Sequence, residues 1–162
     1  MRWGIGATGL AALVAITFLI LRPGPVTDST EYTTVRGAPA VGLYVKRGTR
    51  VMLWDGQRPV AAGDRLRLKV VAEGFTHVSV LTEGDAGDYS ILYEASVEPS
   101  GENVLPPAWE VDDAPGDESL TVILSRTPLA SDSIGAIIRG GAPGDDVWVR
   151  RLSIPKVEES LP

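Results

Sequence analysis

Hydrophobic and polar residues alternate most regularly in the middle of the chain, between residues 62 and 93. From Arg65 to Val70 every second side chain is apolar and the others are cationic, which is the period of a half-buried β-strand. The alternation is interrupted at Glu73-Gly74 and again in the acidic turn 83–88. We therefore predict three consecutive strands in an antiparallel meander, whose apolar face must be covered by other parts of the chain.

Shorter β-prone segments lie on both sides of this meander. They are residues 41–45 and 50–54 before it, and residues 109–111, 119–125 and 145–154 after it. In the segment 119–125, Ile123 points away from the face shared by Leu120, Val122 and Leu124, so we expect this strand to be covered on both faces. In the last segment the apolar phase shifts between Val149 and Leu152, which predicts a β-bulge near Arg150-Arg151.

One helix is predicted in this part of the chain, after Thr127-Pro128. Ser131 is expected to be its N-cap, and the isoleucines at 134, 137 and 138 share one face at helical spacing. Gly140-Gly141 is expected to end it. The predicted fold is therefore mainly β: an antiparallel β-sandwich-like domain over residues 40–155 with one short helix, followed by a polar tail at 156–162.

A long apolar segment precedes the β-rich region. Residues 3–21 contain no charge, and as an α-helix they would be about 28 Å long, close to the roughly 30 Å of bilayer hydrocarbon. Arg2 and Arg22 flank the segment, and no A-x-A-like cleavage site follows it. We predict a single transmembrane helix, with residues 1–22 as an uncleaved anchor. A cleaved signal peptide and a buried core helix are the alternatives.

The residues that follow the anchor favour a linker and set the expected orientation. Residues 23–39 contain Pro23 and Pro25 and are otherwise mostly small and polar, which is typical of a linker. The amino terminus and Arg2 slightly outweigh Arg22, so the C-terminal domain is expected outside the cytoplasm. In a bacterium this corresponds to a single-pass inner-membrane protein with a periplasmic domain, in contact with the lipid bilayer through residues 3–21.

Composition narrows the chemistry. The chain has no cysteine, which excludes disulfides, thiolate metal sites and a cysteine nucleophile. Its formal net charge is -6, and no Lys/Arg cluster is visible along the sequence, so we expect no nucleic-acid partner. High glycine and proline contents, 18 and 12 residues, agree with a domain rich in turns.

Several short sequence features follow one another along the chain in an order that is typical of a known family. They are Gly63-Asp64 opening a strand to Leu68, the strand end 78–81, the segment 91–93, Leu105-Pro106, the acidic turn 112–118 and the segment 125–129. This order resembles a bacterial envelope family of domains of unknown function. Its members are often fused behind zinc-finger anti-sigma factors, protein kinases or caspase-like peptidases, and are common in myxobacteria.

The resemblance covers about residues 50 to 140 and implies an envelope-facing β-sandwich-like module without known catalytic residues. The tyrosine-proline pair that the family usually has after the third strand stands here as Tyr93-Glu94. Because this chain has no cysteine to form a zinc finger, the anti-sigma activity of longer relatives is not implied.

Three groups of residues were weighed as candidate sites. His77 is the single histidine and would have to serve any Ser-His-Asp device, but no nucleophile turn accompanies it. The acidic turns contain Asp85, Asp88, Asp112, Asp113, Asp117, Asp145 and Asp146. Paired acids are used in glycoside hydrolysis and Ca²⁺ binding, yet Asp and Gly are also ordinary turn residues. The aromatic residues Trp54, Trp109, Trp148, Tyr44, Tyr89 and Tyr93 would line a groove or, for most of them, fill a core.

These observations predict no catalytic, cofactor-binding or metal-binding residues. The leading hypothesis is a membrane-anchored, non-enzymatic periplasmic interaction or sensing module with a protein partner in the envelope. A structural subunit of a membrane complex is one alternative. The other is a carboxylate-dependent envelope hydrolase that would use acids near Asp112 to Asp117.

Overall fold

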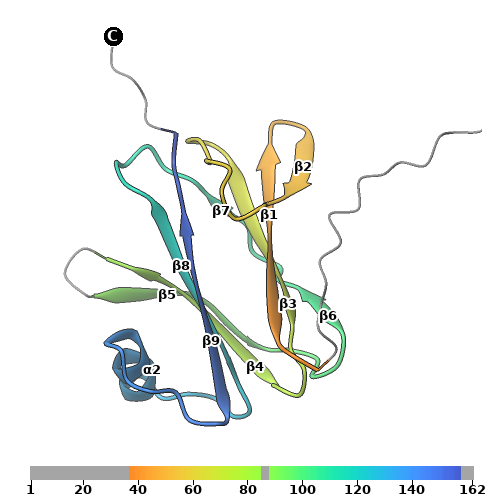
Figure 1. The fold of residues 1–162 in the computed structure, drawn as a ribbon, viewed down its shortest axis with the longest axis vertical. Helices are drawn as coiled ribbons and strands as arrows, with labels where there is room; N and C mark the ends of the chain where they lie inside the picture. The colour runs from red at the N-terminus through yellow and green to blue at the C-terminus, as the bar shows by residue number, and fades with distance from the viewer. Residues whose placement is uncertain (1–36, 85–87, 158–162) are drawn as a thin grey trace, which may run out of the picture. The chain divides into compact units, whose positions relative to one another are not determined.

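The strands of the chain form two antiparallel sheets that face each other (Figure 1). The computed structural model describes residues 37–84 and 88–157. One sheet has the order β2-β1-β3-β6, with β7 also paired to β3, and the other has the order β5-β4-β8-β9. The strands are β1 (Ala40–Arg47), β2 (Arg50–Leu53), β3 (Arg65–Val71), β4 (His77–Glu83), β5 (Tyr89–Ser96), β6 (Glu102–Val104), β7 (Trp109–Glu110), β8 (Glu118–Ser125) and β9 (Val147–Ile154). The predicted mainly antiparallel β fold with one short helix is confirmed.

The main core lies between the two sheets. Strand β3 contributes Leu66, Leu68 and Val70, which are all buried, while the cations between them stay outside, as the alternation predicts. Val78 and Val80 of β4 belong to the same core cluster from the opposite sheet. Burying apolar surface between two sheets is the main stabilisation of such a domain.

The predicted three-strand meander is wrong, because β3 and β4 lie in different sheets. Glu73 and Gly74 both have positive φ, 42° and 91°, and this turn carries the chain from one sheet to the other. The apolar faces of β3 and β4 therefore meet across the core rather than side by side in one sheet. Strands β4 and β5 do form an antiparallel pair, as expected.

Helix α2 (Ser131–Ile138) covers one end of the outer face of the second sheet (Figure 1). Its three isoleucines form a second core cluster with Leu81 of β4 and Ile123 of β8. The predicted two-sided cover of Ile123 is thus confirmed. The helix ends at the predicted glycines, where Gly140 has φ 89° and the Gly141 N–H donates to the Ala136 carbonyl.

The predicted N-cap is wrong by one residue. Ala130 has the extended cap conformation and makes no side-chain cap bond, while Ser131 is already the first helical residue. The Ala130 carbonyl accepts from the N–H groups of both Ser133 and Ile134. The first turn therefore starts from a backbone carbonyl rather than from the serine hydroxyl.

The predicted bulge near Arg150-Arg151 is also wrong. β9 pairs with β8 in unbroken register from Val147 to Ile154. The apolar phase changes because the two ends of the strand bury opposite faces. Val149 packs against the α2 cluster, whereas Leu152 packs into the core between the sheets. The register shift of this sheet lies instead between Val80 and Leu81, opposite β5.

Among residues 37–84 and 88–157, no helix has the length and apolar character needed to cross a membrane. The predicted transmembrane segment at 3–21 and most of the predicted linker and tail lie outside the described residues.

Candidate binding groove on the outer face of the first sheet

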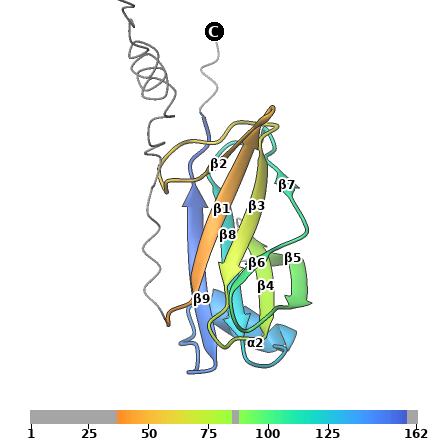
Figure 2. The same cartoon turned by 90° about the vertical axis from the view of Figure 1, so that its right-hand side faces the viewer.

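The first sheet has an outer face that no helix within residues 37–84 and 88–157 covers. Strands β1 and β3 run side by side in this sheet (Figure 2), and their register places Tyr44 opposite Arg67 and Lys46 opposite Arg65. Val51 of edge strand β2 lies on the other side of Lys46. A groove of about 430 Å³ follows this face, and its lining residues are Tyr44, Lys46, Val51, Arg65, Arg67, Val104 and Ala108. That volume lies within the usual range for ligand sites, roughly 300–1,000 Å³.

The groove is cationic. Arg65 makes one long ion pair with Glu110, at 3.4 Å, and both side chains are exposed. Arg67 donates from Nε to the Leu105 carbonyl at 2.9 Å, which leaves its charge without a carboxylate. Within the described residues Lys46 has neither a hydrogen bond nor an ion pair to its side chain. The seven lining residues thus include three cations and no acid, in a chain whose formal net charge is -6.

Apolar side chains flank these cations. Val51 is 63% exposed and Val104 is 53% exposed, so both present apolar surface directly to solvent. Beside Val104 in the register, Lys69 has its ammonium 5.9 Å from the centre of the Tyr44 ring and pairs with Glu102 at 2.8 Å. The hydrogen bond that the Lys69 ammonium donates to the Glu102 carboxylate raises the pKa of Lys69, so this cation stays charged. Tyr44 is therefore held in place from one side.

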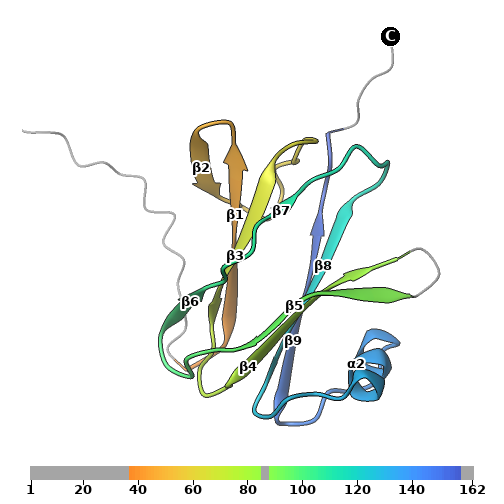
Figure 3. The same ribbon diagram turned by 180° about the vertical axis from the view of Figure 1, so that it is seen from behind.

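Although no Lys/Arg cluster is visible along the sequence, the fold brings three cations together in the groove. Lys46 and Arg65 are far apart in the sequence and become neighbours only because β1 pairs with β3 in this register. Strand β6 adds Val104 through its pairing with Lys69 (Figure 3). The sequence shows that the cations of residues 65–69 share the polar face of one strand. It does not show which strand pairs with this one.

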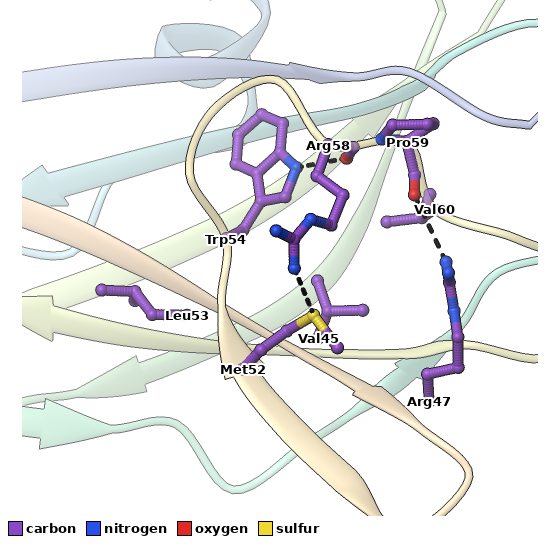
Figure 4. Close-up of a pocket in the computed structure, with 8 residues that line it drawn as sticks. All are labelled: Val45, Arg47, Met52, Leu53, Trp54, Arg58, Pro59 and Val60. Atoms are coloured by element: carbon purple, nitrogen blue, oxygen red, sulfur yellow. Dashed lines mark hydrogen bonds between the residues drawn. The ribbon is translucent and has the colours of Figure 1, made fainter. Parts of the chain in front are cut away.

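A second cavity lies below β2 and is too small for a ligand (Figure 4). Its volume of about 10 Å³ is close to that of a single water position. Val45, Met52 and Val60 project into it, and the Trp54 Nε1–H donates to the Arg58 carbonyl at 2.8 Å. These contacts hold the connector between β2 and β3 in place.

The same connector is fixed by a buried carboxylate. Asp64 is 3% exposed and accepts from Arg47 Nη2 at 2.6 Å, from Arg47 Nε at 2.9 Å and from the Ala61 N–H at 2.9 Å. The Arg47 guanidinium lowers the pKa of Asp64, against the opposing effect of burial. With its lone pairs satisfied and its charge neutralised, this pair holds the fold together and is not a reactive centre.

His77 begins β4 and has no partner suited to nucleophilic catalysis among the described residues. Its Nδ1 lies 2.9 Å from the Thr76 hydroxyl, which itself donates to the Arg126 carbonyl at 2.8 Å. No carboxylate is bonded to the imidazole within the described part of the chain. The geometry does not assemble the Ser-His-Asp arrangement that was weighed from the sequence.

The candidate carboxylates near Asp112 form ion pairs and hydrogen bonds with residues at the C-terminal end of the domain. Lys156 bonds Asp112 at 2.6 Å and Glu118 at 2.7 Å, while Asp117 accepts from the Ser153 hydroxyl at 3.1 Å. The hydrogen bond from Lys156 lowers the pKa of Asp112. Burial disfavours the charge of Lys156, but these two carboxylates outweigh it and raise its pKa. A general acid needs a raised carboxyl pKa, so the arrangement does not favour catalysis.

The other acids of the turns are dispersed. Asp146 pairs with Arg126 at 3.2 Å. No three His, Asp or Glu side chains gather into a possible metal cluster anywhere in residues 37–84 and 88–157. Asp85 lies outside the described residues.

Most of the aromatic candidates fill cores, as predicted. Partly buried aromatic residues that pack against the core between the sheets are Trp54, Trp109, Trp148 and Tyr93, and Tyr89 packs against the α2 cluster. Tyr44 differs, because it lies on the open outer face and lines the groove. One of the six aromatic candidates therefore contributes to the candidate binding surface.

Neither a protein-family model, nor a curated protein, nor a solved structure showed significant similarity to this chain. The resemblance to the bacterial envelope family therefore stays a prediction.

Proposed function

We propose that this chain is a membrane-anchored, non-enzymatic interaction module of the bacterial envelope. Residues 3–21 cross the inner membrane, and the β-sandwich-like domain projects into the periplasm. The domain binds a protein partner through the groove formed by Tyr44, Lys46, Val51, Arg65, Arg67, Val104 and Ala108. The proposal includes membership of the envelope domain family that the sequence resembles.

The observation that carries this proposal is that the outer face of the first sheet exposes apolar side chains and cations without carboxylate partners among the described residues. Two exposed valines and three cations share one groove, and two of the cations, Lys46 and Arg67, have no carboxylate partner in the described part of the chain. Aromatic, apolar and arginine side chains grouped around one concave surface are typical of protein interfaces. Of the acids considered for an envelope hydrolase, Asp112 is engaged with Lys156 and Asp117 with Ser153, which gives that alternative less support.

The function is tested by site-specific photo-crosslinking in the native membrane. A photoreactive phenylalanine analogue is placed at Val51 in the groove, and, as a matched control, at Ile91, an exposed apolar residue of the other sheet. We expect discrete cross-linked products from position 51 and not from position 91. Equal products at both positions, or none at position 51, would contradict a partner in the groove.

Orientation is tested separately on spheroplasts. Externally added protease is expected to remove the β-sandwich-like domain and to leave a short membrane-protected fragment. A domain that stays intact until the membrane is permeabilised would overturn the periplasmic assignment while leaving the groove as a binding surface.

A further inference from the structure

We infer, on the basis of the proposed function, that the partner presents a short acidic segment with apolar residues at both ends. This segment lies across the outer face of the first sheet, with its carboxylates over Lys46, Arg65 and Arg67 and its apolar ends near Val51 and Val104.

The charge arrangement points to an anionic occupant. Lys46 and Arg65 are directly opposite on neighbouring strands, and like charges in that position are destabilising. Arg47 and Arg50 are a second such pair at the same end of β1, and Arg50 has no acid partner among the described residues. Arg47 is neutralised by Asp64, whereas Lys46 is not neutralised from within the described chain. A carboxylate placed between Lys46 and Arg65 would remove the repulsion and add two ion pairs.

The apolar positions set the length of the segment. The groove runs from Val51 on β2, across β1 and β3, to Val104 on β6. Val51 is level with Lys46 and Arg65, whereas Val104 pairs with Lys69, four residues further along β3. Three strand spacings of about 4.8 Å and four residues of about 3.3 Å along the strand give a diagonal of roughly 20 Å, which an extended peptide covers with about seven residues. The cations lie in the middle of this span and the valines at its ends. The complementary segment is therefore about seven residues long, with an apolar residue at each end and acidic residues between them.

The same features favour a peptide over a nucleic acid. Duplex DNA carries one charge per roughly 1.7 Å, and its long backbone would also meet the acidic remainder of a chain with net charge -6. A short acidic peptide confines its charge to the groove. The exposed valines would have no complementary surface on a phosphate backbone, whereas they match apolar side chains.

The experiment measures peptide binding to the full chain in uncharged detergent micelles by fluorescence anisotropy. The probes are labelled Leu-Asp-Glu-Asp-Glu-Asp-Leu, its neutral counterpart Leu-Asn-Gln-Asn-Gln-Asn-Leu, and Gly-Asp-Glu-Asp-Glu-Asp-Gly, which lacks the apolar ends. We expect the affinity of the first probe to be higher than that of the neutral probe by about tenfold or more. It should exceed that of the glycine-flanked probe several-fold. Its affinity should fall as salt approaches about 1 M, where the Debye length is about 3 Å.

Variants locate the site. Lys46→Glu and Lys46→Gln should weaken the first probe, the charge reversal by about tenfold and the neutral change by less. Val51→Asp should weaken it as well. The control is Arg150→Glu, which reverses an exposed strand cation on the other sheet and should change the affinity less than about twofold. Far-ultraviolet circular dichroism and the melting temperature show whether each variant is folded.

Three outcomes would overturn the inference. They are equal binding of the acidic and neutral probes, equal loss with Arg150→Glu and Lys46→Glu, and tighter, groove-dependent binding of a labelled oligothymidine than of any peptide. If cross-linking from position 51 still yields a specific product in any of these cases, the interaction module stands and only the acidic partner is wrong. If that product is also missing, the proposed function itself fails.

Discussion

The two sheets of this domain have outer faces of opposite character. On the second sheet, Leu81 and Ile123 point outward and are fully buried beneath helix α2. On the first sheet, the outward residues Val51 and Val104 remain more than half exposed and are accompanied by cations. An outer face that is closed by the chain itself contributes to folding, whereas one left open with unpaired charge is available to a partner.

The largest expected effect tests the closed face. Ile134→Ala removes a side chain that is 1% exposed and should lower the free energy of unfolding by about 3 kcal/mol, because it leaves a cavity between α2 and the sheet. The matched change on the open face, Val104→Ala, should cost less than about 0.5 kcal/mol. Urea unfolding of the full chain in detergent measures both. Similar losses for the two variants would remove the distinction between the faces.

The next effect concerns adjacent residues of β1, of which Arg47 has an acid partner and Lys46 a like charge. Asp64→Asn should lower the free energy of unfolding by about 2 kcal/mol at pH 7, because a buried, charge-assisted set of hydrogen bonds is lost.

The same variant gives a pH dependence of known sign. Folding lowers the pKa of Asp64, so its stabilisation is fully present above the unfolded pKa, about 3.9, and is lost as pH falls through the lower folded value. The stability gap between wild type and Asp64→Asn should therefore shrink below about pH 4. A gap that widens on acidification would contradict the role of the ionised carboxylate.

A smaller effect is expected where a cation is used for folding rather than for binding. Arg151 donates from Nη2 to the carbonyls of Ile137 and Ile138, at 3.2 and 3.1 Å, and pairs with Glu83 at 3.3 Å. It thereby satisfies the C-terminal end of α2, and Arg151→Ala should cost about 1 kcal/mol.

Arg65→Ala is the matched change on the open face. It removes a single 3.4 Å ion pair between exposed groups and should leave stability nearly unchanged. Thermal unfolding of both variants checks the pair, and an equal loss from Arg65→Ala would mean that the groove cations also serve folding.

The closed face was largely predictable from the sequence and the open one was not. The spacing of apolar residues within a few positions shows that Ile123 and the isoleucines of α2 are buried, so local periodicity predicts that the helix packs on the strand. The same kind of pattern misled at β9, because Val149 and Leu152 are buried by different layers and periodicity does not say which layer buries a residue. The groove depends on pairing between β1 and β3, which is a property of register rather than of either strand.

A small gain in stability separates binding from folding most sharply. Lys46→Glu replaces a like-charge pair with Arg65 by an attractive one, so the free energy of unfolding should rise by about 0.5 kcal/mol. If the groove serves an acidic partner, the same variant loses affinity for Leu-Asp-Glu-Asp-Glu-Asp-Leu while it gains stability. Urea unfolding and anisotropy on one preparation measure both quantities, with Lys46→Gln as the intermediate. Substitution of a residue needed only for the fold would lower stability and affinity together. Substitution of a residue with no role would change neither quantity. Opposite signs are expected only where a repulsion tolerated in the free protein is relieved by its ligand.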